Sequence, residues 1–257
     1  MQTKSALTLP AGFIEQRSHN WTWWVKAGWE ETLPACLAPL PSAIPHRQSA
    51  IRPKGGRGTV QRIELSERGN VIVRHYQRGG FVRHFVRDLY WDRPPRPLVE
   101  LICTETARQR GVLTVEVLGA GVEWVGVGLY HGVFITREAE GCINLWEWLH
   151  GRPAGKVRET AVAAVAQAIA SMHHAGIAHA DLNLTNILVQ IATDSPAVLL
   201  IDFDRGRVFP GSLPPRQRER NLRRLHRSLN KLDPGGLLSS PTDLEIFCRA
   251  YWQRSSS

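Results

Sequence analysis

The sequence has few cysteines, and they lie far apart. Its four cysteines are Cys36, Cys103, Cys142 and Cys248. None of them forms a Cys-x-x-Cys pair or lies among clustered histidines, which argues against both a zinc site and a disulfide framework. We therefore expect a reducing, cytoplasmic setting.

Long apolar runs are also missing. No stretch approaches the roughly 18 apolar residues of a membrane-spanning helix. The opening residues 1–8 lack the apolar core of a signal peptide. Any contact with a membrane is therefore expected to be peripheral.

Acidic residues are outnumbered by basic ones. The 257 residues include 32 Lys and Arg against 23 Asp and Glu, a net charge of +9. A basic surface favours nucleic acid, anionic lipid or phosphorylated ligands, and charge alone does not choose between them or exclude a merely solubilising role. The length and the 43% hydrophobic content suit one large domain or two modest lobes.

The first half of the chain predicts a small β-sheet that carries one helix. Residues 1–45 are expected to form an irregular extension, whose four tryptophans either pack on the domain or meet a membrane surface. Strands are expected at 59–65, at 71–76 and within 113–118 and 122–136, with a helix at 98–110. We take 46–137 as an N-terminal lobe.

The second half, 138–257, predicts a helical lobe, which gives an α+β fold. Helices are expected at 145–149, at 159–175 with Gly176 as its stop, and at 216–232. The last of these is basic and amphipathic, with a stripe formed by Leu222, Leu225, Leu229 and Leu232. The final residues 254–257 are expected to fray.

Two short motifs carry the chemistry. Residues 179–186 read His-Ala-Asp-Leu-Asn-Leu-Thr-Asn, and Asp202-Phe203-Asp204 follows an apolar hairpin. The hairpin folds the chain back, so Asp181, Asn186 and Asp202 are expected to converge. Carboxylate and amide oxygens suit Mg²⁺, which leaves Asp181 to orient a hydroxyl and His179 to brace the loop.

A glycine-rich loop precedes the first expected strand. Gly55, Gly56 and Gly58 lie in Lys-Gly-Gly-Arg-Gly. Backbone amides in such a loop can cradle phosphates, although the same glycines could simply form a turn.

These motifs resemble those of the protein-kinase-like superfamily, in which His-x-Asp-x-x-x-x-Asn and Asp-Phe-Gly are the hallmark pair. Together with "RHYQRGG" and "NLRRLHRSLNK", they resemble the lipopolysaccharide kinases of the Kdo/heptose family. The resemblance spans roughly residues 55–231 and implies a two-lobed kinase fold with the nucleotide bound by the N-terminal lobe.

By position, the resemblance makes Asp181 the catalytic acid/base, with Asn186 and Asp202 as metal ligands. Arg74 stands where the nucleotide-binding Lys is usual, and its guanidinium geometry differs from that of an ammonium. Glu100 is its expected partner, with Glu105 as the fallback. Asn183 replaces the Lys of protein-kinase catalytic loops, which argues against a protein substrate.

The family implies ATP with Mg²⁺, and the 4-hydroxyl of Kdo (3-deoxy-D-manno-octulosonic acid) in Kdo-lipid A as acceptor. It also implies a peripheral place on the cytoplasmic face of the inner membrane. Arginines suit the anionic acceptor, and the candidates are Arg78, Arg83, Arg87, Arg205 and Arg207. Helix 216–231 could meet lipid headgroups through Arg216, Arg220, Arg223 and Arg227.

Alternative functions stay open at this point. The same chemistry could serve heptose or a small-molecule hydroxyl. A catalytically silent kinase-fold module that binds acidic lipid or nucleic acid is a different class, motivated by Arg74 and Asp204. The intact Asp181, Asn186 and Asp202 favour an enzyme, and nucleic acid is not the expected partner.

Overall fold

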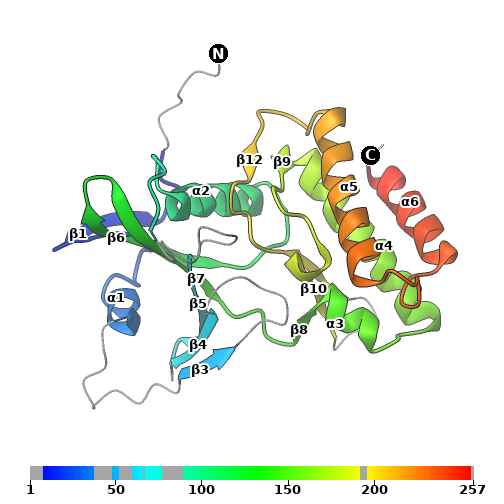
Figure 1. Ribbon diagram of the computed structural model, residues 1–257, viewed down its shortest axis with the longest axis horizontal. Helices are drawn as coiled ribbons and strands as arrows, with labels where there is room; N and C mark the ends of the chain where they lie inside the picture. The colour runs from blue at the N-terminus through cyan, green and yellow to red at the C-terminus, as the bar shows by residue number, and fades with distance from the viewer. Residues whose placement is uncertain are drawn as a thin grey trace. The chain divides into compact units, whose positions relative to one another are not determined.

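The computed structural model describes residues 8–37, 48–51, 60–65, 67–76, 89–191 and 196–255. The chain divides into two compact units, Met1–Glu105 with Glu116–Glu138, and Thr106–Val115 with Ala139–Ser257. The first unit is built on a β-sheet and the second mainly on helices (Figure 1). The α+β class is therefore confirmed.

The described strands of the first unit form one antiparallel sheet of seven, in the order β1-β2-β6-β7-β5-β4-β3. Their bounds are β1 Phe13–Ser18, β2 Trp21–Lys26, β3 Gln48–Ile51, β4 Val60–Leu65, β5 Gly69–His75, β6 Val117–Gly126 and β7 Leu129–Arg137. Two helices among the residues described here belong with the sheet, α1 Thr32–Leu37 and α2 Arg96–Gln109, although the last residues of α2 fall in the second unit.

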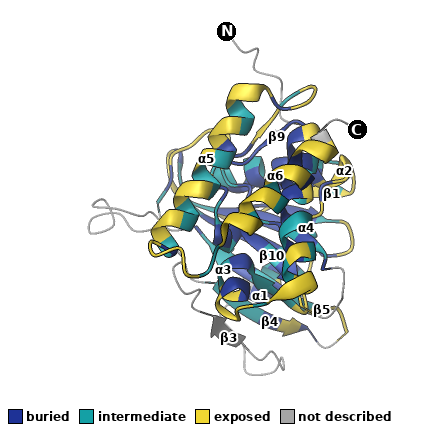
Figure 2. Ribbon diagram, turned by 90° about the vertical axis from the view of Figure 1, so that its right-hand side faces the viewer, coloured by how far each residue is buried: buried dark blue, intermediate teal, exposed yellow. Residues whose placement is uncertain are grey.

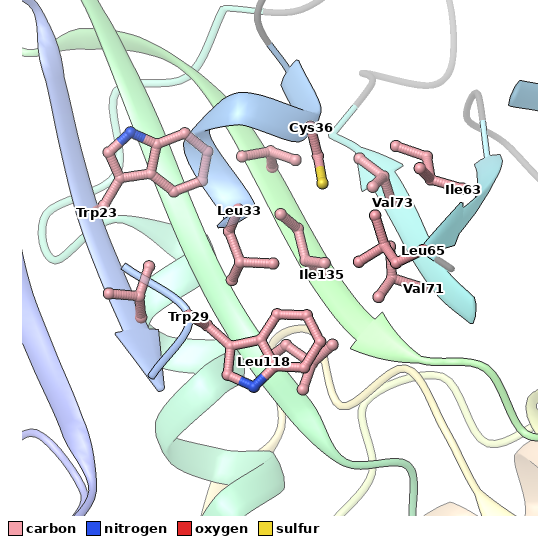
Figure 3. Close-up of a cluster of buried hydrophobic side chains, with 12 residues drawn as sticks. Trp23, Trp29, Leu33, Cys36, Ile63, Leu65, Val71, Val73, Leu118 and Ile135 are labelled. Carbon is pink, nitrogen blue, oxygen red and sulfur yellow. The ribbon is translucent and has the colours of Figure 1, made fainter. Parts of the chain in front are cut away.

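Each face of this sheet has its own apolar cluster. Alternate residues of a strand point to opposite faces, so Val133 and Ile135 join one cluster and Phe134 joins the other. Leu33 of α1 packs into the first cluster (Figure 3), and Leu101 of α2 packs into the second. The two helices therefore pack against opposite faces of the sheet.

The expected irregular extension at the N-terminus is wrong for its described part. β1 and β2 form a hairpin, and β2 pairs with β6 inside the sheet. Trp23, Trp24 and Trp29 are each at most 8% exposed, because they fill the two core clusters. Packing on the domain, rather than contact with a membrane surface, therefore explains these three tryptophans.

The expected strands within 113–118 and 122–136 are placed wrongly, because β6 runs unbroken from Val117 to Gly126. In the sequence, Gly119 and Gly121 suggest the end of a strand, but in the structure both lie inside β6. A Cβ on Gly121 would lie 2.6 Å from the Trp23 ring. Glycine is needed there to admit the indole, and the turn comes later, between β6 and β7.

The described part of the second unit holds four further α-helices, α3 Leu145–His150, α4 Gly155–His174, α5 Pro215–Leu232 and α6 Pro241–Ser255. Among its described residues, β8 Cys142–Asn144, β10 Ile187–Gln190 and β11 Val198–Leu200 form a three-stranded sheet. The short β9 Ile177–Ala178 pairs with β12 Arg207–Val208, and the 3-10 helix η2 covers Leu184–Asn186. The predicted hairpin and the three predicted helices are confirmed, although α4 begins at Gly155.

Helix α6 is not predicted from the sequence, and it packs along α4. Arg254 lies in its last turn rather than in a frayed end. Gly176, the predicted stop of α4, has a φ of +74°, and a Cβ there would lie 2.0 Å from the carbonyl oxygen of Gly211. Both the left-handed backbone and the close approach require glycine.

In the described part of the chain, none of the helices is long and apolar enough to span a membrane. The outer face of α5 is exposed to solvent (Figure 2). Its four leucines are half-buried, and the one buried residue of the helix is polar, Asn221.

Candidate active site

His179 braces the loop of residues 179–186, which follows β9 and is called the catalytic loop after its predicted role. Its side chain is buried, and its Nδ1 accepts a hydrogen bond from the backbone N–H of Asp181 at 3.1 Å. The ring proton therefore resides on Nε2, which donates to the carbonyl oxygen of Ile201 at 2.9 Å. Burial lowers the pKa of His179, so the ring is neutral in this position. One side chain thus ties Asp181 to the residue before Asp202.

Asp181 is held through its backbone while its carboxylate stays exposed. Its carbonyl oxygen accepts from the amide nitrogens of Asn186 at 2.9 Å and Asn183 at 3.2 Å. Within the described residues, no hydrogen bond or ion pair occupies the Asp181 carboxylate. The loop therefore fixes the position of Asp181 through backbone hydrogen bonds and leaves its carboxylate exposed.

Asn183 caps the 3-10 helix η2. Its Oδ1 accepts from the backbone N–H groups of Thr185 at 2.8 Å and Asn186 at 3.1 Å, and from the Thr185 hydroxyl at 2.7 Å. An asparagine favours such a turn because its side chain replaces a missing backbone acceptor. The residue that stands in place of the protein-kinase Lys therefore shapes the loop.

Asn186 and Asp202 are brought together by the hairpin. The Asn186 amide nitrogen donates to Asp181, which turns its oxygen away from that carbonyl. The backbone carbonyl oxygen of Asn186 accepts a hydrogen bond from the N–H of Ile201 at 3.0 Å. Because Asp202 is the next residue after Ile201, this hydrogen bond holds the backbone of Asp202 near Asn186. One oriented amide oxygen and one carboxylate form a donor set that fits Mg²⁺.

Asp202 and Arg205 both have left-handed backbones. Their φ values are +64° and +56°, which is unfavourable for residues with a Cβ and is common at functional turns. Phe203 between them is fully buried and lies 5.0 Å from the His179 ring, centroid to centroid. The buried ring holds the turn, while Arg205 remains exposed.

Arg207 lies close to the catalytic loop in the sheet. In β12 it is exposed and stands opposite Ala178, the residue before His179. Of the other predicted acceptor-binding residues, Arg78, Arg83 and Arg87 lie outside the described residues. The predicted phosphate loop, Gly55, Gly56 and Gly58, also lies outside them.

The first unit pairs Arg74 with Glu100. Nη2 of Arg74 lies 2.5 and 2.6 Å from the two carboxylate oxygens, and Glu100 is 1% exposed. The Tyr76 hydroxyl donates to the same carboxylate. The Arg74 guanidinium also lies 4.9 Å from the Tyr76 ring centre and 5.5 Å from that of Phe134. Planar stacking of this kind suits arginine better than lysine.

Two sequence comparisons bear on this site. A sequence model of the lipopolysaccharide kinase (Kdo/WaaP) family matches residues 45–251. A protein named 3-deoxy-D-manno-octulosonic acid kinase, from Xylella fastidiosa (strain M12), is 34% identical over 209 residues, or 78% of this chain and 79% of that protein. One of the same name from Pasteurella multocida (strain Pm70) is 34% identical over 165 residues, or 63% of this chain and 66% of that protein.

The chain belongs to the lipopolysaccharide kinase (Kdo/WaaP) family. A solved structure of WaaP in complex with acyl carrier protein matches with a TM-score of 0.56 at 22% identity, covering 81% of this chain and 80% of that one. This likeness supports the kinase-like fold. Membership of this family makes the protein a kinase, that is, a phosphotransferase, and the family implies ATP as the phosphate donor.

Sequence reasoning missed the residue that attaches α5 to the catalytic loop of this lipopolysaccharide kinase. Nδ2 of Asn221 donates to the carbonyl oxygen of His179 at 2.6 Å, and its Oδ1 accepts from the His179 N–H at 3.2 Å. Both residues are buried. The signal was an asparagine directly before Leu222 in an otherwise amphipathic helix, where a buried polar group needs a specific partner.

His173 and Tyr251 extend this network into α4 and α6. Since the Asn221 amide nitrogen already donates to His179, its oxygen is the acceptor for His173 Nε2, at 3.2 Å. His173 Nδ1 then accepts from the Tyr251 hydroxyl at 2.7 Å. Burial lowers the pKa of His173 to about 4, so the ring is neutral at pH 7. Three helices are thus linked to the catalytic loop without a charged side chain.

Proposed function

We propose that this lipopolysaccharide kinase transfers the γ-phosphate of ATP to the 4-hydroxyl of Kdo in Kdo-lipid A. The observation that carries the proposal is the loop that presents Asp181 with a fully bonded backbone and an exposed carboxylate. The acceptor is supported by the relatives named 3-deoxy-D-manno-octulosonic acid kinase, at 34% identity.

Asp181 would accept the proton of the attacking hydroxyl. As the hydroxyl oxygen bonds to the γ-phosphorus, the bond from that phosphorus to the β,γ-bridging oxygen breaks and ADP leaves. The exposed carboxylate can meet a sugar hydroxyl, while His179 and Asn186 fix its distance from the rest of the loop. Proton transfer by a positioned group contributes about 10²–10⁴-fold to such reactions.

Asn186 and Asp202 would hold Mg²⁺, which when bound neutralises charge on the transferring phosphates. In the first unit, Arg74 would contact the donor phosphates, and Glu100 would hold its guanidinium in place. The ion pair at 2.5 Å and the two flanking rings support this role, because they restrict the guanidinium to one orientation.

The acceptor is an anionic glycolipid, so we propose peripheral contact with the cytoplasmic face of the inner membrane. Arg205 and Arg207 are exposed on the turn and strand that follow Asp202, where they could meet the sugar acid. A groove along α5 could meet headgroups, and its described lining residues are Arg216, Glu219, Arg220, Arg223, His226, Arg227 and Asn230. Each basic residue near an anionic surface contributes about 1 kcal/mol.

An acceptor panel tests the proposal. Purified protein with ATP and Mg²⁺ is incubated with Kdo-lipid A, with a heptose-containing acceptor and with an aminoglycoside. We expect mass spectrometry to show one added phosphate on Kdo-lipid A alone, and phosphorus-coupled NMR to place it on the 4-hydroxyl. Phosphorylation of another acceptor only, or of another hydroxyl, would overturn this assignment.

A further inference from the structure

Helix α5 is attached directly to the catalytic loop, so its cations have a fixed relation to Asp181. Asn221 binds both backbone groups of His179, and Ser228 Oγ accepts from the Leu184 N–H at 3.3 Å. Arg224 adds a longer contact from Nη1 to the His179 carbonyl oxygen at 3.4 Å. One edge of α5 therefore runs beside the loop that carries the catalytic acid.

This edge is a stripe of arginines. Arg220, Arg224 and Arg227 are spaced by four and three residues, which places them on one side of a helix. Arg224 is half-buried, and its surroundings include Arg207 from β12 as well as Asp181. We call Arg207, Arg220, Arg224 and Arg227 the arginine edge.

The arginine edge concentrates positive charge without matching acids. In the part of the chain that the structure describes, none of its four members forms an ion pair. Burial lowers the pKa of Arg224, and Arg220, Arg227 and Arg207 lower it further, whereas Asp181 acts in the opposite direction. Like charges held together in this way are stabilised when an anion binds among them.

Two other arginines of the same helix already have hydrogen-bond partners. Arg223 pairs with Glu219 at 2.6 Å, and Arg218 donates to the Leu213 carbonyl oxygen at 2.6 Å. Arg216, in the first turn of the helix, also has no ion pair among the described residues, but no hydrogen bond ties it to the catalytic loop, whereas Arg224 contacts the His179 carbonyl oxygen. The contacts between this edge and the catalytic loop, together with its unpaired charge, distinguish it from the rest of the basic helix.

We propose that the arginine edge is the acceptor's anion subsite, holding a carboxylate or phosphate of the glycolipid while its hydroxyl lies at Asp181. The inference rests on the proposed function and adds the residues that select a negatively charged acceptor. Arginine suits the role because its guanidinium binds planar anions through two parallel hydrogen bonds.

The test combines enzyme variants with neutralised acceptors. Arg224→Gln and Arg224→Lys are assayed with Kdo-lipid A in neutral detergent micelles, so that no anionic bilayer contributes. We expect Arg224→Gln to raise the acceptor KM by about tenfold or more, with Arg224→Lys between it and wild type and the KM for ATP unchanged. Arg249→Gln, which removes one exposed charge from α6, is the matched control and should leave both KM values unchanged.

Two modified acceptors identify the anion. One has the Kdo carboxylate converted to an amide, and the other lacks the lipid A phosphates. The rise in acceptor KM caused by Arg224→Gln should vanish with one of these two acceptors, and the group missing from that acceptor is then the anion that the arginine edge binds. The inference is overturned if this rise is the same on all three acceptors, or if Arg224→Gln leaves the acceptor KM unchanged. Failure of wild-type protein to phosphorylate Kdo-lipid A at all would instead refute the proposed function.

Discussion

The two units position their key side chains by opposite means. In the first, Arg74 is held by a charged carboxylate and by aromatic rings. In the second, His173, Asn221 and His179 form neutral hydrogen bonds that end at the catalytic loop. The neutral network supports the loop while leaving the Asp181 carboxylate exposed to ligands. The ion pair holds the Arg74 guanidinium in one orientation, as its proposed contact with donor phosphates would require.

The largest stability effect is expected at the centre of the neutral network. Asn221→Ala leaves both backbone groups of His179 and the Nε2 proton of His173 without their buried partner. Each such loss costs about 1–3 kcal/mol, so we expect the free energy of unfolding to fall by about 4 kcal/mol. Urea unfolding followed by far-ultraviolet circular dichroism measures it. Asn230→Ala, on the exposed side of the same helix, should change it by less than about 0.5 kcal/mol.

The histidine of this network predicts a pH dependence. The pKa of His173 is about 4 in the folded protein against 6.5 ordinarily, so between these values the unfolded chain binds the extra proton. The stability is fully present above pH 6.5 and falls by about 3 kcal/mol as the pH drops to 4. Urea midpoints of wild type and His173→Gln, measured from pH 7 to 4, should converge as the pH falls.

The exposed neighbour His174 provides the control for this titration. His174→Gln should keep the full wild-type pH dependence. If His173→Gln retained it as well, the neutral state of the network would be refuted. The buried His179 contributes in the same direction, so some dependence should remain in the His173 variant.

The smallest effect is expected in the charged cluster of the first unit. Arg74→Lys keeps the positive charge beside Glu100 but loses the planar contact with Tyr76 and Phe134. We expect a loss of about 1 kcal/mol of stability and a change of less than about tenfold in the KM for ATP. Arg74→Met leaves the buried Glu100 carboxylate without its cation, so we expect a larger loss of stability and a larger rise in the KM for ATP than with Arg74→Lys. Equal behaviour of the two variants would show that the charge does not hold this cluster together.

Much of the catalytic loop could be predicted from the sequence, because its motif residues act through short-range contacts. The hairpin 187–201 has clear strand and turn signals, and it brings Asn186 next to Ile201. The ion pair of Arg74 with Glu100 is implied by the family resemblance, with Glu105 as the fallback, and the structure confirms the pair with Glu100. Their roles in nucleotide and metal binding stay predictions.

The features that were missed depend on contacts between distant segments. The sequence of β1 and β2 alone suggests an irregular extension. Their place in the sheet depends on the packing of the Trp23 ring against Gly121, about a hundred positions later in the chain. Asn221 looks like an ordinary polar residue until the fold buries it against His179. Helix α6 gains its stability from packing on α4, which local propensity does not reveal.

The most direct test of the account is the activity of Asp181→Asn on Kdo-lipid A. Because the Asp181 carboxylate is exposed, we expect kcat to fall about a thousandfold with unchanged urea stability and ATP binding. Glu245→Gln, an exposed acid on α6, should retain full activity. Near wild-type turnover by Asp181→Asn would contradict the central claim that the loop exists to present this acid to the acceptor hydroxyl.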